Sequence, residues 1–356
     1  MSDTKPTARL SELSRLNVLF CLLVVIVHVA SHSVSVLDKS SWQYLAVQVP
    51  QKLAFVSMFG FFFLSGLKTF LPGDGPVPLA AYYRKRARTI LLPYLIAVCV
   101  YYAAIVSLGW EQFDPTRLLR YCLVGDLSSH FYFVIALVQF ILLLPLWRRV
   151  VERYDPALVL PFALLITLLS TRYLDSFLSP FFPGFYFPYS DRVFSTYLVY
   201  YLAGCFAGRE YGKFLAFLER NRRLIRVLFG CFTLAAAVLT ALHFSGRAQV
   251  GYLEEVYLGY QLCGVLFLFD LAAARRDKPL PGPVKAIDRV SYLIYLYHCL
   301  VLLAVQGLLD RLGVTKVSLL FVLRGIVTYG VTISACLLWR LLAERIKKAL
   351  PRRGPC

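Results

Sequence analysis

The sequence predicts an all-α integral membrane protein with about ten transmembrane helices and both termini in the cytoplasm. Of its 356 residues, 59% are hydrophobic and 16% are charged, whereas a soluble domain carries about 25% charged residues. The mean hydropathy is +0.65. Ten apolar runs approach or reach the roughly 17–25 residues that a helix needs to cross a bilayer. This composition leaves no room for a large soluble domain.

The ten predicted spans follow one another with short loops between them. They are residues 16–36, 53–71, 90–108, 130–147, 157–178, 193–208, 224–243, 253–274, 288–309 and 317–340. The first run is too long for the apolar region of a cleavable signal peptide, and no small-residue cleavage site follows it, so we expect it to remain as a span. We therefore predict a cytoplasmic segment at 1–15, one membrane domain at 16–342 and a basic cytoplasmic tail at 343–356.

The basic residues predict the orientation of these spans. Most of the 38 Lys and Arg residues lie in the N-terminal segment, the even-numbered loops and the C-terminal tail. The positive-inside rule places these regions, and hence both termini, in the cytoplasm. We expect the membrane to be the cytoplasmic membrane of a bacterium. The net charge of +18 is then explained by topology and by contact with anionic membrane lipid. It does not indicate a nucleic-acid partner.

The cysteines argue against a disulfide framework or a cysteine-based metal site. The nine cysteines are scattered singly, with no CxxC spacing, and most fall inside apolar runs. Thiols in such runs usually pack as small apolar groups.

A histidine deep in the first span is the first candidate for chemistry. His28 lies about twelve residues into that span, roughly 18 Å along the helix. A neutral imidazole there can accept a proton from a hydroxyl group as a general base. A structural histidine bonded to a neighbouring helix is the alternative. His32 lies one turn further on the same face, which would also allow a two-histidine metal site, but no third ligand is evident, and we predict no metal.

A dense basic run precedes the third span. Arg84, Lys85, Arg86 and Arg88 are four cations within five residues. Guanidinium groups bind phosphate in a bidentate manner, so this run is suited to the phosphates of a cytosolic cofactor. Anchoring to lipid headgroups is the competing interpretation.

Three further polar residues stand among aromatic side chains. His130 and Tyr132 open the fourth span, and His298 lies within the ninth. A sugar ring can stack on such surfaces, although packing histidines would give the same pattern. We keep both interpretations.

In combination and in order, these segments resemble the membrane acyltransferase-3 family. The similar features are His28 in the first span, the FFFLSG segment at 61–66, the basic run that ends in Pro93-Tyr94, the aromatic HFYF segment at 130–133 and the IYLYH segment at 294–298. The chain departs from the family pattern before the histidine. Asn17 stands where an arginine is expected and Ser14 where an acid is expected, while Arg15 lies two residues away.

The resemblance implies transfer of an acyl group, of the acetyl or succinyl class, from cytosolic acyl-CoA to a hydroxyl of a cell-surface or lipid-linked glycan. It implies His28 as the catalytic base, with Asn17 and Arg15 in support. Arg84, Arg86 and Arg88 would hold acyl-CoA; His130, Tyr132 and His298 would line the acceptor side. Other cell-envelope polysaccharide proteins are expected partners. The alternatives are a protein that exports or flips a surface polysaccharide, and a degenerate family member that acts as an interaction partner.

Overall fold

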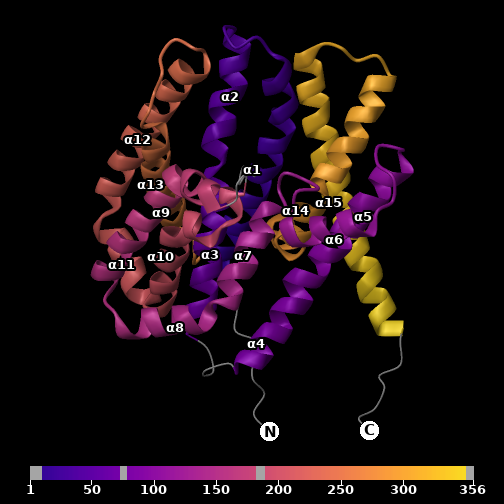
Figure 1. The fold of residues 1–356 in the computed structure, drawn as a ribbon. Coiled ribbons are helices and arrows are strands. Elements are labelled where there is room, and N and C mark those ends of the chain that lie inside the picture. Colours follow the sequence, from indigo (N-terminus) through magenta and orange to yellow (C-terminus); the bar gives the residue numbers. More distant parts are fainter. Residues whose placement is uncertain (1–9, 73–77, 182–188, 350–356) are drawn as a thin grey trace. The chain divides into compact units, whose positions relative to one another are not determined.

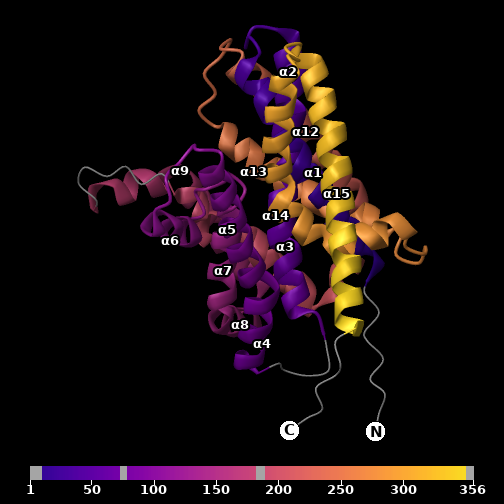
Figure 2. The same ribbon diagram turned by 90° about the vertical axis from the view of Figure 1, so that its right-hand side faces the viewer.

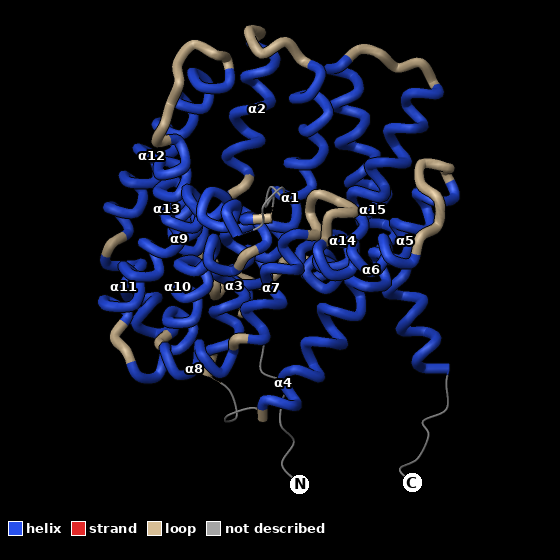
Figure 3. Tube along the Cα trace, in the orientation of Figure 1, coloured by secondary structure: helices blue, strands red, loops and turns tan. Residues whose placement is uncertain are grey.

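All regular elements in the described part of the chain are helical. The computed structural model describes residues 10–72, 78–181 and 189–349, and these ranges contain helices and loops without a strand (Figure 1; Figure 3). Together with the long apolar helices, this confirms the prediction of an all-α integral membrane protein.

The chain forms two compact units, which we call the terminal unit and the central unit. The terminal unit combines residues from 1–54 and 274–356, and the central unit is formed by residues 55–273. The helices of the terminal unit are α1 (Ser11–Val36), α2 (Trp42–Ala54), α14 (Gly282–Arg311) and α15 (Val317–Ala349). Helix α1 begins before the predicted limit of the first span, and α15 continues beyond the predicted limit of the last.

In the terminal unit, α1 runs parallel to α14 and antiparallel to α15 (Figure 2). Asn17 contacts Asp288 and His28 lies beside His298, so α1 and α14 advance together. In contrast, Tyr329 of α15 reaches back to the carbonyl of Leu22. The start of α1 and the late part of α15 consequently lie at the same end of this unit. This arrangement is the one required if both termini lie on the same side of a membrane.

The described residues of the central unit form eleven α-helices. They are α3 (Val56–Phe70), α4 (Leu79–Arg86), α5 (Leu92–Ser107), α6 (Pro115–Val124), α7 (Tyr132–Leu142), α8 (Leu144–Arg153), α9 (Pro156–Leu178), α10 (Leu198–Arg209), α11 (Tyr211–Arg220), α12 (Arg222–Phe244) and α13 (Leu253–Ala273). A π-helical turn at Ala87–Leu91 joins α4 to α5, and 3₁₀ turns lie at Ser179–Phe181, Ser190–Arg192 and Phe194–Tyr197. Stacked aromatic pairs fill the core, with ring centroids 4.2 Å apart for Phe62 and Tyr197 and 4.1 Å apart for Phe140 and Tyr201.

Eight helical segments of the described residues are long and apolar enough to cross a membrane, or nine if one bent pair counts as a span. The difference from ten arises at two places. The predicted fourth span is broken between α7 and α8, which meet at 62°, because Pro145 begins a new helix there. In the predicted sixth span, α10 has only 12 residues, about 18 Å of helix.

Glycines allow α3 and α10 to approach closely. A Cβ atom on Gly204 would overlap the backbone of Phe63, and one on Gly66 would overlap the carbonyl oxygen of Tyr201. Gly208, one turn after Gly204, faces the backbone of Leu67 in the same way. Small residues spaced by four allow this close packing of helices in membranes.

Gly204→Ala is therefore expected to destabilise the central unit by about 1–3 kcal/mol, the usual effect of overpacking. Gly230→Ala on α12 is the matched control, because a Cβ there meets no atom within 4 Å. Thermal unfolding of the purified protein in detergent measures both variants. Equal melting temperatures for the two would contradict the close approach of α3 and α10.

Candidate functional site

Two histidines from distant parts of the sequence meet in the terminal unit. The ring centroids of His28 on α1 and His298 on α14 are 5.1 Å apart, with the ring planes inclined by 55°. His298 is fully buried and His28 is half-buried. The parallel packing of α1 and α14 thus brings together the residue predicted as catalytic base and one of those predicted for the acceptor side.

Backbone carbonyls fix the tautomer of His298. Its Nδ1 atom lies 2.8 Å from the carbonyl oxygen of Tyr295 and 3.1 Å from that of Ile294. Since a carbonyl oxygen can only accept, Nδ1 must carry the hydrogen in the neutral ring. The lone pair of Nε2 then faces the thiol of Cys299 at 3.3 Å. His298 is therefore held as an oriented proton acceptor.

The same place could hold a metal ion. Ligand atoms of His28, His298 and Cys299 all lie within 4.8 Å of one another. The third ligand, which the sequence did not reveal, comes from Cys299, and His32 is not part of the group. Histidines that bind a metal through one ring nitrogen commonly donate the other N–H to a backbone carbonyl, as Nδ1 of His298 does here. That the protein binds no metal therefore stays a prediction.

Asn17 joins α1 to α14 away from the histidine pair. Its Nδ2 atom donates to Asp288 Oδ1 and to Ser291 Oγ, both at 2.7 Å, and Ser14 Oγ donates to Asp288 Oδ2 at 2.8 Å. Asp288 is 5% exposed. Asn17 precedes His28 by three turns, about 16 Å of helix, so its bonds help to set the register of α1 against α14.

Arg15, the second predicted supporting residue, lies at the end of this unit. Its Nη2 atom donates to the carbonyl oxygens of Lys278 at 3.0 Å and Pro279 at 3.1 Å. These bonds hold the segment that leads into α14.

Removing the Asp288 carboxylate is expected to destabilise the terminal unit. In Asp288→Ala the buried Ser14 hydroxyl loses its acceptor and the half-buried Asn17 amide loses one of its two, at a cost of about 1–3 kcal/mol. Asp277→Ala, whose side chain is 95% exposed, is the control. In thermal unfolding in detergent, the melting temperature of Asp288→Ala should fall below that of the control. The melting temperature of Asp288→Asn should lie between them. If Asp288→Ala melts with the control, the network does not hold α1 to α14.

Helix α15 adds buried polar residues that the sequence reasoning missed. Arg324, Thr328 and Thr332 are spaced by four and share one helix face; they are 4%, 0% and 1% exposed. Arg324 Nη1 donates to Gln306 Oε1, and Gln306 Nε2 donates to Asp310 Oδ1 at 2.6 Å. Among the described residues, Arg324 Nε and both threonine hydroxyls have no hydrogen-bond partner. Arg324 also lies within electrostatic range of Asp310 and of Cys299.

A signal for Arg324 was present in the sequence. It is an ionisable residue inside the predicted span 317–340, and such a residue is a functional candidate by default.

The basic run lies in the central unit, across the junction of α4 and α5. Arg84 and Arg88 are exposed, whereas Arg86 is half-buried. The Arg86 guanidinium lies 5.1 Å from the centre of the Tyr82 ring and donates to Thr69 Oγ1 at 3.3 Å. The chain here contains the π-helical turn Ala87–Leu91, a feature that is frequent at functional sites.

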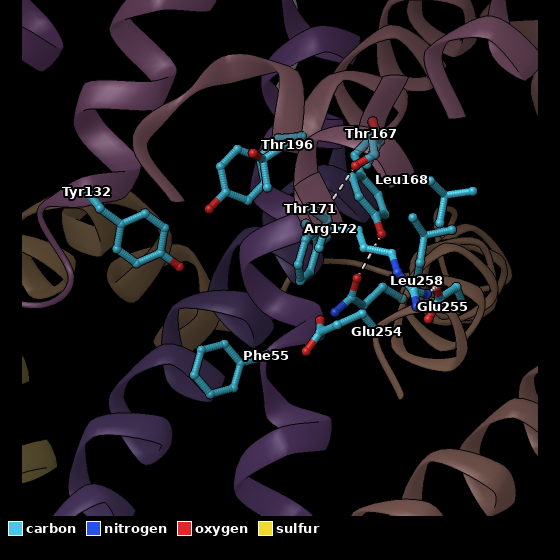
Figure 4. A pocket seen from close by; sticks show the side chains of 14 residues that line it. Phe55, Tyr132, Thr167, Leu168, Thr171, Arg172, Thr196, Glu254, Glu255 and Leu258 are labelled. Carbon is cyan, nitrogen blue, oxygen red and sulfur yellow. Dashed lines mark hydrogen bonds and ion pairs between the residues drawn. The ribbon is translucent and has the colours of Figure 1, made fainter. Parts of the chain in front are cut away.

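The remaining acceptor-side candidates, His130 and Tyr132, also lie in the central unit. His130 is 1% exposed; its Nδ1 atom is 3.0 Å from Ser128 Oγ, and its ring packs against Tyr101 and Phe131. Tyr132 lines a cavity together with residues of α3, α9, α10 and α13 (Figure 4).

Comparison with known proteins gives one consistent result. The sequence model of the acyltransferase domain Acyl_transf_3 matches residues 12–340. YfiQ of Bacillus subtilis, provisionally named a membrane-bound acyltransferase, is 22% identical over 303 residues, which cover 82% of this chain and 80% of that protein. No solved structure matches the chain significantly.

Two staphylococcal relatives carry a different provisional name, poly-β-1,6-N-acetyl-D-glucosamine export protein. The Staphylococcus aureus protein is 24% identical over 307 residues, or 82% of each chain. The Staphylococcus epidermidis protein is 25% identical over 301 residues, which cover 82% of this chain and 81% of that protein.

Proposed function

Because this chain belongs to the acyltransferase-3 family, we propose that it moves an acyl group from cytosolic acyl-CoA to a hydroxyl of a cell-surface or lipid-linked glycan. The observation that carries this proposal is the histidine pair of His28 and His298, held inside helices that are apolar enough to span a membrane. We place the protein in the bacterial cytoplasmic membrane with both termini in the cytoplasm.

The proposed reaction uses His28 as the general base. His28 takes the proton of the acceptor hydroxyl while the hydroxyl oxygen attacks the thioester carbonyl carbon. The new C–O bond forms, the C–S bond breaks, and the CoA thiolate leaves and receives the proton from the imidazolium. The backbone carbonyls that accept from Nδ1–H of His298 hold its ring in one orientation beside His28. In the proposed reaction, Nε2 of His298 faces the reacting groups.

Arg324 supplies positive charge beside the proposed centre. It is almost fully buried and interacts with Cys299, which in turn contacts His298. Its hydrogen-bond partner is the neutral amide of Gln306, and the carboxylate that acts on its charge is that of Asp310. A fixed cation of this kind stabilises the negative charge that develops on the thioester oxygen and on the leaving sulfur.

The exposed cations Arg84 and Arg88, with Arg86 beside them, would bind the phosphates of CoA. Anchoring to anionic lipid remains the structural alternative for this segment. Competition between acyl-CoA and anionic vesicles for the purified protein distinguishes the two.

Mass spectrometry of base-labile esters on the surface glycans of the host tests the proposed function. We expect the esters to disappear in a deletion strain and to return on complementation, while the polymer still reaches the cell surface. Loss of the polymer from the surface, with unchanged ester content in the polymer that remains inside the cell, would overturn the proposal in favour of export, the activity for which the staphylococcal relatives are named.

A further inference from the structure

The central unit contains an apolar groove of about 680 Å³ among α9, α10, α11 and α13 (Figure 1). This volume lies within the roughly 300–1,000 Å³ of ligand pockets. Almost all of the lining residues are apolar, and the small side chains of Ala203 and Ala207 on α10 are among them. Since these two residues are one turn apart, they leave room on one face of α10 for an elongated apolar group.

The groove has the length of an acyl chain within one leaflet of a bilayer. On α9, which is a candidate span, its lining residues extend from Pro156 to Leu164. The helical rise between them is about 12 Å. The hydrocarbon core of a bilayer is about 30 Å thick, so each leaflet contributes about 15 Å.

Charged residues lie at one end of the groove. Its ionisable lining residues are Glu210 and Lys213, which stand where α10 ends and α11 begins. Lys213 Nζ is 2.7 Å from Glu210 Oε2. The far end of the lining on α10 is Val199, so the groove is apolar away from this junction.

A second hollow, of about 410 Å³, adjoins the charged end. Lys213 and Phe217 line both the groove and this hollow, and Arg220 lines the hollow. Arg220 is exposed and forms no ion pair with a described residue. Two cations and the carboxylate of Glu210 leave one net positive charge where the two hollows meet.

Helix α11 is suited to the membrane interface. Phe214, Phe217 and Leu218 have the spacing of one helix face, whereas Lys213 and Arg220 are exposed. Amphipathic helices of this kind lie at the level of the lipid headgroups. The loop that contains α11 belongs to the face that the basic residues place in the cytoplasm. The cations are then level with the phosphates of the cytoplasmic leaflet.

Two simpler explanations cover part of these observations. Lipid tails are as apolar as leucine, so an acyl chain gains little on entering an apolar groove, and any annular lipid could fill it. Basic residues at a cytoplasmic helix end are also expected from topology alone. Neither explanation requires the two cations to stand at the mouth of the groove. That placement matches a molecule with a chain and an anionic headgroup.

We propose that the groove binds an anionic diacyl phospholipid of the cytoplasmic leaflet, with one acyl chain along α9 and the phosphate at Lys213 and Arg220. The leaflet follows from the proposed orientation. The preference for a negative headgroup rests on the groove and its cations, and it does not depend on acyl transfer.

Native mass spectrometry of the full-length protein with defined lipids tests this site. Dioleoylphosphatidylglycerol and dioleoylphosphatidylcholine have the same chains, but only the former has a net negative headgroup. The anionic lipid should bind about 5–25-fold more tightly, because each Lys or Arg near a membrane surface contributes about fivefold. The lower value applies if Glu210 offsets the charge of Lys213.

Three variants separate the headgroup from the chain. Arg220→Gln should lower the preference about fivefold, and the double variant Lys213→Gln/Arg220→Gln should abolish it. Arg223→Gln is the matched control, because Arg223 is exposed in the same loop but lines neither hollow. Ala203→Leu fills the groove and should weaken both lipids equally.

Equal binding of the two lipids by the unmodified protein would overturn the proposal. So would a loss of preference in Arg223→Gln as large as that in Arg220→Gln, since general surface charge would then explain the result. Displacement of the anionic phospholipid by undecaprenyl phosphate at equal concentration would assign the groove to a polyprenyl carrier instead. Because none of these measurements uses acyl transfer, this site and the proposed function can fail separately.

Discussion

His28→Ala is expected to lower acyl transfer by about 10²–10⁴-fold, the contribution of a positioned general base. Membrane insertion and thermal stability should change little, because the described ties between α1 and α14 at Ser14, Asn17 and Asp288 remain in the variant. Base-labile esters in a deletion strain that carries the variant provide the cellular measurement. Release of CoA from acyl-CoA by the purified protein provides the biochemical one.

His32→Ala is the matched control for this prediction. His32 lies one turn from His28 on the same helix but outside the group of ligand atoms formed by His28, His298 and Cys299. The control should retain most of the activity. Undiminished transfer by His28→Ala would exclude His28 as the base. Metal analysis of the purified protein, with loss of activity on chelation, would instead assign the His28 group to metal binding.

The sequence predicted the membrane class and the individual polar residues, because both depend on local composition. Charged residues are few, the apolar runs are long, and His28 and His298 each stand out within such a run. Their meeting could not be predicted from local patterns. It depends on the parallel packing of α1 and α14, which the contacts of Asn17 with Asp288 and Ser291 help to fix.

The same limit explains what the sequence reasoning missed. Glu254 and Glu255 stand where a span begins, and Arg172 stands near the end of one, so each looks like an ordinary boundary residue. Only the packing of α9 against α13 shows that they face one cavity. The length of α10 was also overestimated, because the apolar run continues through the 3₁₀ turn at Phe194–Tyr197.

Arg324→Gln should lower acyl transfer by about 10²–10³-fold, comparable to the loss of one group that stabilises charge in a transition state. The reason is the position of this cation. It is 4% exposed within a candidate span, where an ionised side chain is costly. Its hydrogen-bond partner is the neutral amide of Gln306, which donates in turn to Asp310, and the charge of Asp310 also acts on Arg324. The prediction tests whether this cation also stabilises the negative charge that appears during the proposed reaction.

Two comparisons separate this role from a structural one. Arg324→Lys keeps the charge but not the guanidinium geometry, so its activity should lie between that of Arg324→Gln and the unmodified protein. Arg311→Gln removes an exposed cation from the end of α14 and should be neutral. In Arg324→Gln we expect kcat to fall while KM for acyl-CoA and the melting temperature stay close to normal. A fall in stability that matches the fall in activity would show that Arg324 serves the packing of α15, and the charge beside His298 and Cys299 would then need another source.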